Sequence, residues 1–349
     1  MKFSEIDRFL CRMLQEKVCG DYAVLIHCKG EEKLLTSPCV NRDTYFDNAS
    51  LGKIFITAPL ILRAIGEGKL TLDTVLADCF PDVPEDKKGI TVKQLLTHTA
   101  GITTYGLPPE ASEMSRHEQA SLILRYPLVY TPGESYIYSC FGFILLGFLA
   151  EKIYGAPLDR VFEQYIRKPL GYTRSRFNIA VDEPNAAVCY SRKDVGEYRA
   201  DDGNVRVLKG VAGNGASYST AGDIQIFVQA VLDRSPVLYH PSLYALAETD
   251  YTPDFSEGRG LGYLMPDVRY RQTGRLFPEG SFGHCGHTGQ SVFINRAEDL
   301  YVILLTNTTR YSNIRSGFCG YDYGDTMRMR ENVHNAIYED LKSAGLISY

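Results

Sequence analysis

Residues 50–62 read SLGKIFITAPLIL: a serine, a lysine three residues later and then an almost unbroken apolar run. Residues at this spacing share one face of a helix, so the side chains of Ser50 and Lys53 can touch. Because the residues after Lys53 are apolar, the helix is expected to be buried, and a buried lysine needs a partner or a chemical task. The stretch therefore predicts a core helix, from about residue 51 to residue 65, that begins with a polar pair.

The pair has the chemistry of a nucleophile and a base. A serine hydroxyl attacks poorly at neutral pH unless a base takes its proton, and lysine can be that base where burial lowers its pKa. The unpaired N–H groups of a first helical turn also suit a developing oxyanion. The alternative is an N-cap serine beside a solvated lysine. Ser50 is the only serine in the chain with a lysine three residues on, which favours the chemical interpretation.

Helices and strands follow a definite order on either side of this helix. The expected elements are a helix over 3–14, strands over 22–27 and 34–36, the core helix, helices over 90–96, 115–124, 141–154 and 158–166, a helix capped at 219–223 and ending near 232, strands over 262–265, 281–284, 291–295 and 301–306, and a helix over 327–341. This order predicts an α/β protein of the α+β type, in which an antiparallel sheet built from both chain ends is flanked by helices and joined to a mostly helical subdomain. We expect one catalytic domain over residues 1–349, with residues 1–69 and about 210–349 in the α/β core and about 70–209 in the helical subdomain and loops.

Composition and charge exclude several classes of protein. The chain of 349 residues is 44% hydrophobic with a net charge of −5, and it has no basic stripe, so no nucleic-acid partner is expected. Charges interrupt the first residues, and the longest apolar stretch, 141–150, is too short to cross a bilayer, so neither a signal peptide nor a membrane partner is expected. The nine cysteines contain no CxxC pair, which favours free thiols in the cytoplasm. Nothing in the sequence indicates the oligomeric state.

Two further segments carry groups suited to the same chemistry. Tyr138 follows a Pro-Gly turn and precedes an apolar helix, and a phenol beside a lysine ammonium can ionise and act as a base; the alternative is a core tyrosine. The run Gly286-His287-Thr288-Gly289-Gln290 is either a glycine-rich hairpin or a backbone that approaches a ligand closely, with the Gln290 N–H completing an oxyanion hole. His284, Cys285 and His287 lack an evident fourth ligand, so no metal site is expected.

Taken in order, these segments resemble the serine beta-lactamase and penicillin-binding-protein-like superfamily. The similarity is closest to class C beta-lactamases, D-alanyl-D-alanine carboxypeptidases of that type and related esterases, and it extends from about residue 20 to residue 310. Beyond the Ser-x-x-Lys element, it rests on LLTHTAGI at 95–102, on the segment 132–147 with Tyr138-Ser139 and LLG, on 215–223, and on 286–289, where the family has Lys-Thr-Gly or His-x-Gly.

The resemblance implies a role for each matching residue. Ser50 is the acylated nucleophile, and Lys53 and Tyr138 share the general-base and general-acid work. The implied substrate-binding residues are Cys140, His287, Gly289 and Gln290, with the oxyanion hole formed by the N–H groups of Ser50 and Gln290. His98 is implied to be structural. No cofactor is implied, and the expected partner is a small-molecule acyl substrate.

Two departures from the family pattern bear on the substrate. Cys140 stands where the family has an asparagine that holds a substrate amide, and a thiol hydrogen-bonds only weakly. His287 stands for a lysine that helps to bind a substrate carboxylate. A literal Tyr-x-Asn, at Tyr311-Ser312-Asn313, lies after the glycine-rich run, out of family order, and is interpreted as a chance match. The departures favour esters over amides.

The predicted function is therefore a serine hydrolase that acts through an acyl-enzyme on a carboxylic ester or related acyl substrate. The alternatives within the family are a D-stereospecific peptidase or amidase, a weak beta-lactamase, and an acyltransferase that uses the same acyl-enzyme. A protein that keeps the fold as an inactive binding module or scaffold is the non-enzyme alternative, although such a protein would be free to lose the serine or the lysine.

Overall fold

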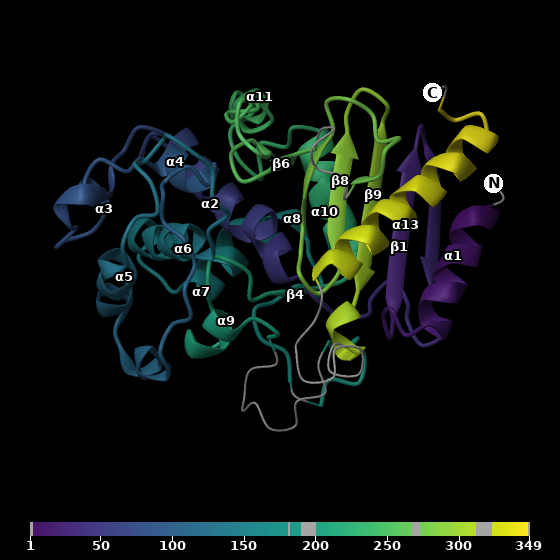
Figure 1. Ribbon diagram of the computed structural model, residues 1–349, viewed down its shortest axis with the longest axis horizontal. Helices are drawn as coiled ribbons and strands as arrows, with labels where there is room; N and C mark the ends of the chain where they lie inside the picture. Colours follow the sequence, from purple (N-terminus) through teal and green to yellow (C-terminus); the bar gives the residue numbers. More distant parts are fainter. Residues whose placement is uncertain (1–2, 181, 190–199, 267–272, 312–322, 348–349) are drawn as a thin grey trace.

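Strands from both ends of the chain meet in one sheet (Figure 1). The structure, a computed structural model, describes residues 3–180, 182–189, 200–266, 273–311 and 323–347. The sheet has seven strands in the order β2-β1-β9-β8-β7-β6-β5, and every neighbouring pair is antiparallel. The strands are β1 (Tyr22–Cys28), β2 (Glu31–Thr36), β5 (Gly258–Arg259), β6 (Leu264–Met265), β7 (Phe282–Cys285), β8 (Ser291–Asn295) and β9 (Leu300–Thr306).

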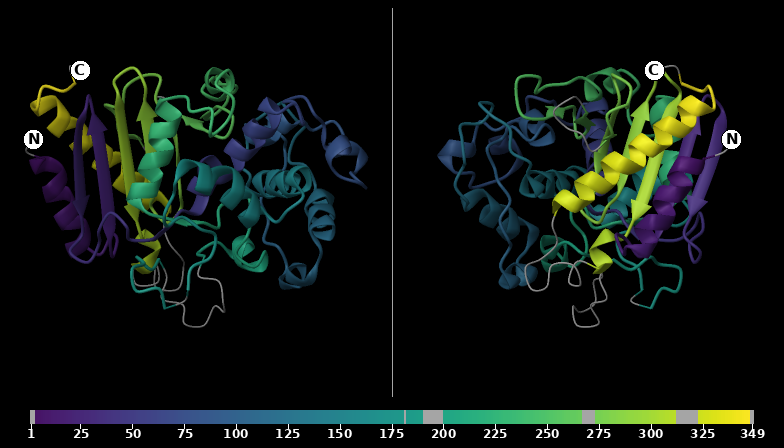
Figure 2. Two further views of the ribbon diagram at one scale, coloured as in Figure 1. Left: turned by 180° about the vertical axis from the view of Figure 1, so that it is seen from behind. Right: turned by 45° about the vertical axis from the view of Figure 1, so that its right-hand side comes forward.

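Helices cover both faces of this sheet, and the alternation of side chains along the strands explains why. In β1, Val24 and Ile26 point into the layer formed by α1 (Ser4–Gln15) and α13 (Tyr323–Ser343), whereas the intervening Leu25 points into the larger core on the other face. Figure 2 shows α13 across one face and α10 (Ala221–Leu232) across the opposite face. Since both faces are buried, the central strands are almost continuously apolar.

The helical part of the molecule lies beyond the β5 edge of the sheet. It contains α3 (Leu76–Cys79), α4 (Val92–Leu96), α5 (Arg116–Arg125), α6 (Cys140–Tyr154), α7 (Leu158–Phe162), α8 (Lys168–Leu170) and α9 (Gly203–Val207), with α11 (Leu243–Ala247) nearby (Figure 1). Helix α6 is buried over most of its length. The mixed α/β architecture, with an antiparallel sheet flanked by helices, confirms the predicted fold class.

The core helix differs from the single helix predicted over residues 51–65. It begins as a 3₁₀-helix, Ala49–Leu51, continues as a π-helical turn, Lys53–Thr57, and becomes α-helical only in α2 (Ala58–Gly66). A π-helical turn changes the hydrogen-bond register without changing the apolar composition, so sequence periodicity cannot reveal it. The predicted helix over 158–166 is interrupted in the same way, by a π-helical turn at Glu163–Arg167. The pair β3 (Phe46–Asp47) and β4 (Tyr218–Ser219) was not predicted, since two-residue strands carry no period.

One described helical segment is long and apolar enough to cross a membrane, and a second candidate passes only if two helices separated by a bend are counted as one span. One is Ala49–Gly66, of which 78% is buried inside the molecule. The other is the pair formed by α6 and the segment Leu158–Leu170, which is bent by 72°. In both cases the apolar side chains pack in the protein core, as they do in core helices of globular proteins.

Candidate active site

Ser50 lies in a short turn that the surrounding backbone holds in an unusual conformation. The residue before it, Ala49, has a φ of 44°, a region that non-glycine residues seldom occupy outside constrained sites. The Ala49 N–H donates to Oδ1 of Asp47 at 2.9 Å, and the side-chain amide of Asn48 donates to Oγ of Ser217 at 2.9 Å. The turn is therefore fixed from both β3 and the segment before β4.

Lys53 is completely buried directly behind Ser50. Its Nζ donates to Oγ of Ser50 at 3.0 Å, to the carbonyl oxygen of Asn214 at 2.7 Å and to Sγ of Cys140 at 3.5 Å. Burial lowers the pKa of Lys53, because the charged form loses its hydration. The lysine is thus close to the serine, and its ammonium gives up a proton more easily than that of a solvated lysine.

A close approach of two glycines makes this arrangement possible. A Cβ on Gly52 would lie 2.8 Å from the carbonyl oxygen of Gly215, a distance that real side chains do not tolerate. The segment that carries Asn214 can therefore lie directly on the turn between Ser50 and Lys53. The hydroxyl of Thr57 donates to the carbonyl oxygen of Gly213 at 2.6 Å and fixes the same segment one turn further along.

Tyr138 completes the cluster from the residues just before α6. Its hydroxyl donates to Oγ of Ser50 at 2.8 Å, and Nζ of Lys53 lies 4.9 Å from the centre of its ring. Nδ1 of His98 accepts the backbone N–H of Ser139 at 3.0 Å, and the His98 carbonyl oxygen accepts the N–H of Ile137 at 3.1 Å. The loop is thus held on both sides of Tyr138. The structure brings the three predicted catalytic side chains together at one point.

The cluster opens into a cavity of about 460 Å³. The helical part, the segment around β5 and β6, the end of β7 and the start of α13 all contribute to its wall. The lining residues are Ser50, Tyr136, Tyr138, Cys140, Asp202, Glu257, Arg259, Leu264, His284, Cys285, His287 and Met327. A cavity of this size with a few convergent polar groups suits a small organic substrate.

Gly289 and Gln290, which were predicted to bind substrate, do not line this cavity. Gln290 is fully buried, and its side-chain amide donates to the carbonyl oxygens of Asp47 and of Thr306, the latter at 2.9 Å. Gly289 packs against Thr306 so closely that it has no room for a Cβ. The physical reason is that the chain turns away after β7 to begin β8, so only the first residues of the turn reach the cavity. Gln290 supports the backbone beside Ser50 from behind.

The sequence analysis predicts that residues 287–290 bind substrate beside Ser50, but the end of β7 lies at this part of the cavity wall. His284 and Cys285 line the cavity, and the ring of His284 lies 6.1 Å from that of Tyr138. A Cβ on Gly286 would lie 2.8 Å from the carbonyl oxygen of Asn48, so glycine is required where the strand meets the Ser50 turn. The pattern His-x-Gly fits His284-Cys285-Gly286 as well as His287-Thr288-Gly289, and this earlier match is the signal that could have identified the strand end.

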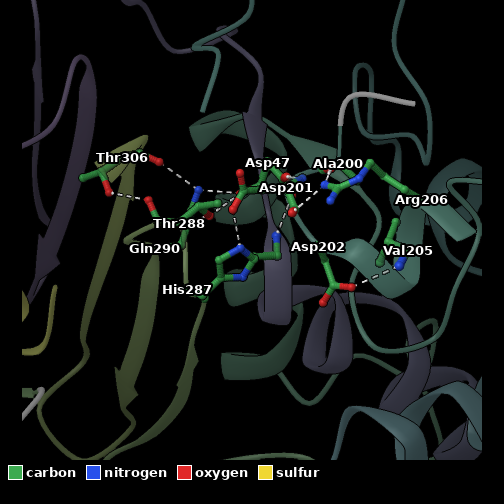
Figure 3. A network of polar contacts seen from close by, with 12 residues as sticks. Asp47, Ala200, Asp201, Asp202, Val205, Arg206, His287, Thr288, Gln290 and Thr306 are labelled. Atoms are coloured by element: carbon green, nitrogen blue, oxygen red, sulfur yellow. Dashed lines mark hydrogen bonds and ion pairs between the residues drawn. The ribbon is translucent and has the colours of Figure 1, made fainter. Parts of the chain in front are cut away.

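His287 lines the cavity but is already engaged by an acidic group (Figure 3). Its Nε2 lies 2.7 Å from Oδ2 of Asp201, and the N–H of Asp201 donates to Oδ2 of Asp47 at 2.9 Å. Burial alone would lower the pKa of His287, but the hydrogen bond and charge of Asp201, together with Asp202 and Asp47, raise it above its ordinary value. Burial raises the pKa of Asp47 to about 6. A substrate carboxylate at His287 would therefore have to compete with Asp201.

A polar cluster at the cavity, formed by Tyr136, Glu257 and Arg259, was not identified from the sequence. Nη2 of Arg259 donates to the hydroxyl of Tyr136 at 2.7 Å and pairs with Glu257, and the Tyr136 hydroxyl donates to Glu257 at 2.8 Å. The segment 252–259 is expected from the sequence to be one of the loops that shape the pocket, but it carries no recognisable motif, so only the fold singles out Glu257 and Arg259.

Cys140, in contrast, lies where it was predicted to lie. It begins α6, its thiol faces Lys53, and it lines the cavity. The Asn313 of the chance Tyr-x-Asn match lies outside the described residues. Within the described residues, no group of three or more His, Cys, Asp or Glu side chains is placed to hold a metal ion.

Solved structures share this architecture over nearly the whole chain. EstCE1, described as a hydrolase with promiscuous acyltransferase activity, superimposes with a TM-score of 0.73 at 20% identity, over 95% of this chain and 97% of that one. An octameric penicillin-binding protein homologue from Pyrococcus abyssi superimposes with a TM-score of 0.72 at 21% identity, over 99% of this chain and 78% of that one. The fold is that of the penicillin-binding proteins and serine beta-lactamases.

The amino-acid sequence identifies the family. The family model described as Beta-lactamase matches residues 12–315, and the chain belongs to this family. A protein of Escherichia coli (strain K12), provisionally named a D-alanyl-D-alanine carboxypeptidase, is 27% identical over 299 residues, which cover 76% of this chain and 69% of that protein. Family and fold together indicate a serine hydrolase of the beta-lactamase and transpeptidase kind, and they confirm the resemblance stated from the sequence motifs.

Proposed function

We propose that the chain is a serine hydrolase that forms an acyl-enzyme on Ser50 and acts on a carboxylic ester or a related acyl substrate. The observation that carries the proposal is the position of the Ser50 oxygen. Oγ lies within hydrogen-bond distance of both the Tyr138 hydroxyl (2.8 Å) and Nζ of Lys53 (3.0 Å), at the wall of the cavity. A serine in this position has two candidate bases in direct contact.

In the proposed first step, Tyr138 and Lys53 act as one proton-accepting unit. The pair gives up a proton to solvent before the substrate binds, which leaves either a phenolate or a neutral amine next to Oγ. The pair then takes the Ser50 proton while Oγ forms a bond to the acyl carbon. The burial of Lys53 supports this step, because it lowers the pKa of the amine.

The negative charge that develops on the acyl oxygen needs hydrogen-bond donors. We assign this role to the backbone N–H of Ser50 and to the N–H of His287, which follows Gly286. The support is the close approach of Gly286 to the backbone of Asn48, which joins the end of β7 to the Ser50 turn. Backbone donors held in place in this way contribute strongly to acyl transfer, because they need no reorganisation during the reaction.

The tetrahedral intermediate then breaks its bond to the leaving group. The leaving oxygen departs with the proton held by Tyr138 and Lys53, and the acyl group remains on Ser50. A water molecule, deprotonated by the same pair, then attacks the acyl carbon. The bond from the acyl carbon to Oγ of Ser50 breaks, the pair returns the proton to Oγ, and the acid is released. An alcohol or amine that enters in place of water would receive the acyl group, which is how a transferase would use this site.

The chemistry around Cys140 supports an ester substrate. The thiol lies 3.5 Å from Nζ of Lys53, at the position where the family motif has asparagine. A thiol provides neither the strong donor nor the strong acceptor of a carboxamide, so the grip on a substrate amide is weakened. The second candidate, a D-stereospecific peptidase or amidase, is supported by the Escherichia coli relative.

We also propose that the protein works in a reducing compartment such as the cytoplasm, on a small molecule and without a nucleic-acid or membrane partner. The support is that none of the eight cysteines in the described part of the chain forms a disulfide.

The test uses three substrates in parallel: a short-chain p-nitrophenyl ester, nitrocefin and a D-alanyl-D-alanine peptide. Each is incubated with the wild type, with Ser50→Ala and with Ser242→Ala, a control at an exposed serine. We expect ester turnover in the wild type and the control, its loss by at least about a thousandfold in Ser50→Ala, and an acyl adduct on Ser50 in the intact mass. Turnover of only the lactam or the peptide would establish the second candidate. Absence of both turnover and adduct would favour an inactive binding protein.

A further inference from the structure

Tyr138 is flanked by two cations, and only one of them belongs to the proposed proton-accepting pair. Nζ of Lys53 lies 4.9 Å from the centre of the Tyr138 ring, and the guanidinium carbon of Arg259 lies 5.4 Å from it. Arg259 comes from β5, at the edge of the sheet, and its side chain is almost completely buried. In a buried position, a charge at this distance acts with little screening by solvent.

We propose that Arg259 is a positioning residue whose charge stabilises the deprotonated state of the Tyr138–Lys53 pair. This inference rests on the proposed function of that pair. A positive charge at this distance favours the phenolate over the phenol and the neutral amine over the ammonium. Both effects make the pair a better proton acceptor at neutral pH. Burial is the largest cause of the lowered pKa of Lys53, Cys140 and Asp202 act against it, and the charge of Arg259 makes a smaller contribution in the same direction as burial.

The other described groups that face Tyr138 do not replace this charge. His98, after α4, and His284, on β7, have their rings 4.6 Å and 6.1 Å from that of Tyr138. Burial lowers the pKa of both histidines well below the ordinary value, helped by the charges of Arg259 and Lys53. Both rings are therefore neutral at neutral pH. Cys140 and Asp202 approach from α6 and from the residue before α9, and neither can supply a positive charge.

Glu257 and Tyr136 set the strength of the Arg259 charge. Glu257 pairs with Nη2 of Arg259, and the Tyr136 hydroxyl lies between the two groups, 2.7 Å from Nη2 and 2.8 Å from the carboxylate. The carboxylate attenuates the guanidinium charge and holds it in place over the rings of Tyr136 and Tyr138. Removal of the arginine and removal of the glutamate should therefore move the proton affinity of the pair in opposite directions.

The experiment measures the pH dependence of two Ser50 reactions in Arg259→Gln, Arg259→Lys, Glu257→Gln and the wild type. One reaction is hydrolysis of p-nitrophenyl butyrate, followed as kcat/KM, and the other is covalent labelling of Ser50 by a fluorophosphonate probe, which needs no knowledge of the natural substrate. We expect the acidic limb of both profiles to move up by about one pH unit in Arg259→Gln, to move down in Glu257→Gln, and to stay near its original position in Arg259→Lys.

The opposite directions separate a charge effect from a loss of structure, because both Arg259→Gln and Glu257→Gln break the same ion pair. The inference would be overturned if the acidic limbs of Arg259→Gln and Glu257→Gln moved in the same direction. It would also be overturned if both limbs kept their positions while kcat/KM and the labelling rate fell at every pH. A rise in KM confined to esters of acidic acyl groups, with no limb shift, would instead make Arg259 a substrate carboxylate site and would also overturn it. If the fluorophosphonate probe did not label Ser50 even in the wild type, the proposed function itself would be rejected. This result differs from labelling that occurs with an acidic limb at the same pH in every variant.

Discussion

The ring of His98 accepts the backbone N–H of Ser139 through Nδ1 at 3.0 Å, directly beside the residue that contacts Ser50. His98 is buried, has a φ of 59°, and its ring centre lies 4.6 Å from that of Tyr138, with the two rings tilted by 36°. Its imidazole is neutral, because burial holds its pKa well below the ordinary value. The histidine thus fixes the geometry of the tyrosine loop without entering the proton transfer.

Replacement of His98 should therefore change the position of the Tyr138 loop and the stability of the protein, but not the pH dependence of kcat/KM. We expect His98→Leu to lower the melting temperature by several degrees, because it leaves the Ser139 N–H without its acceptor and places a branched side chain at a positive φ. His98→Asn, which tolerates this φ and keeps an acceptor, should retain more of the stability. Thermal melts and the kcat/KM profile check both points. A shifted acidic limb in either variant would contradict a purely positional role.

Lys53→Met and Tyr138→Phe should each lower kcat/KM for the ester by about 10²- to 10⁴-fold, because each removes part of one proton-accepting unit. The double variant should lose little more than either single variant, since residues that act as a unit are not additive. Lys53→Met should keep or raise the melting temperature, because a buried ammonium is costly to fold. Lys88→Met, at an exposed ion pair with Glu85, serves as the control. Fully additive losses would indicate that the two residues act in separate steps.

Cys140→Asn should shift the preference of the enzyme toward amides. The carboxamide restores a donor and an acceptor at the wall of the cavity, and one such hydrogen bond corresponds to about a tenfold gain. The measured quantity is the ratio of kcat/KM for nitrocefin or a D-alanyl amide to that for the ester, with Cys140→Ala as the matched variant that lacks the amide. An unchanged ratio in Cys140→Asn would mean that another group decides between the substrates.

Gly286→Ala should lower ester turnover by about a hundredfold, since a Cβ at this position would push the end of β7 away from the Ser50 turn and misplace its N–H donor. Gly89→Ala is the matched control, because nothing lies within 4 Å of a Cβ at Gly89 and its φ is ordinary. Labelling of Ser50 by the fluorophosphonate probe should fall in parallel. Wild-type turnover in Gly286→Ala would place the oxyanion donors elsewhere.

The pair of His287 with Asp201 should make stability depend on pH. Because the folded-state pKa of His287 is raised, its contribution is fully present below the unfolded value of about 6.5 and is lost as the pH rises through the folded value. Asp47 changes the stability in a lower pH range. Because burial raises its pKa from 3.8 to about 6, its carboxyl group lowers the stability of the fold as the pH rises from 3.8 to about 6. The difference in melting temperature between the wild type and His287→Asn should therefore narrow as the pH rises above about 6.5. A melting-temperature difference that stays constant above about pH 6.5 would show that His287 and Asp201 do not form an ion pair.

The strands and long helices were predictable because each has a strong local signal. The run from Tyr301 to Leu305 is apolar without interruption, and β9 occupies Leu300–Thr306. Thr220 accepts the N–H of Asp223 and caps α10 as expected. The π-helical turn at Lys53–Thr57 and the two-residue strands β3 and β5 were not predictable, because they are decided by contacts with distant segments and leave no period in the sequence.

The residues of the candidate site also fall into two groups, those that the sequence predicted and those that it did not. Ser50, Lys53, Tyr138 and Cys140 lie in segments with recognisable spacing, and the structure brings them together. The third segment was placed at residues 287–290, whereas His284, Cys285 and His287 line the cavity; His-x-Gly fits 284–286 and 287–289 equally well, and the register of β7 against β8 brings the first match to the cavity. Arg259 has no sequence signal, since its importance depends on a fold that brings β5 over Tyr138.

The pairing of β1 with β9 also has a consequence for the order of events during synthesis on the ribosome. Tyr22 lies opposite Thr306 and Cys28 opposite Leu300, so β1 is made long before β9 can cover this side of it. The Ser50 turn follows β1 closely, but β7 reaches this turn, and Arg259 reaches Tyr138, only from the late part of the chain. A nascent chain therefore carries Ser50 and Lys53 long before it can use them, and its unpaired strands are exposed to aggregation and to chaperones in that interval.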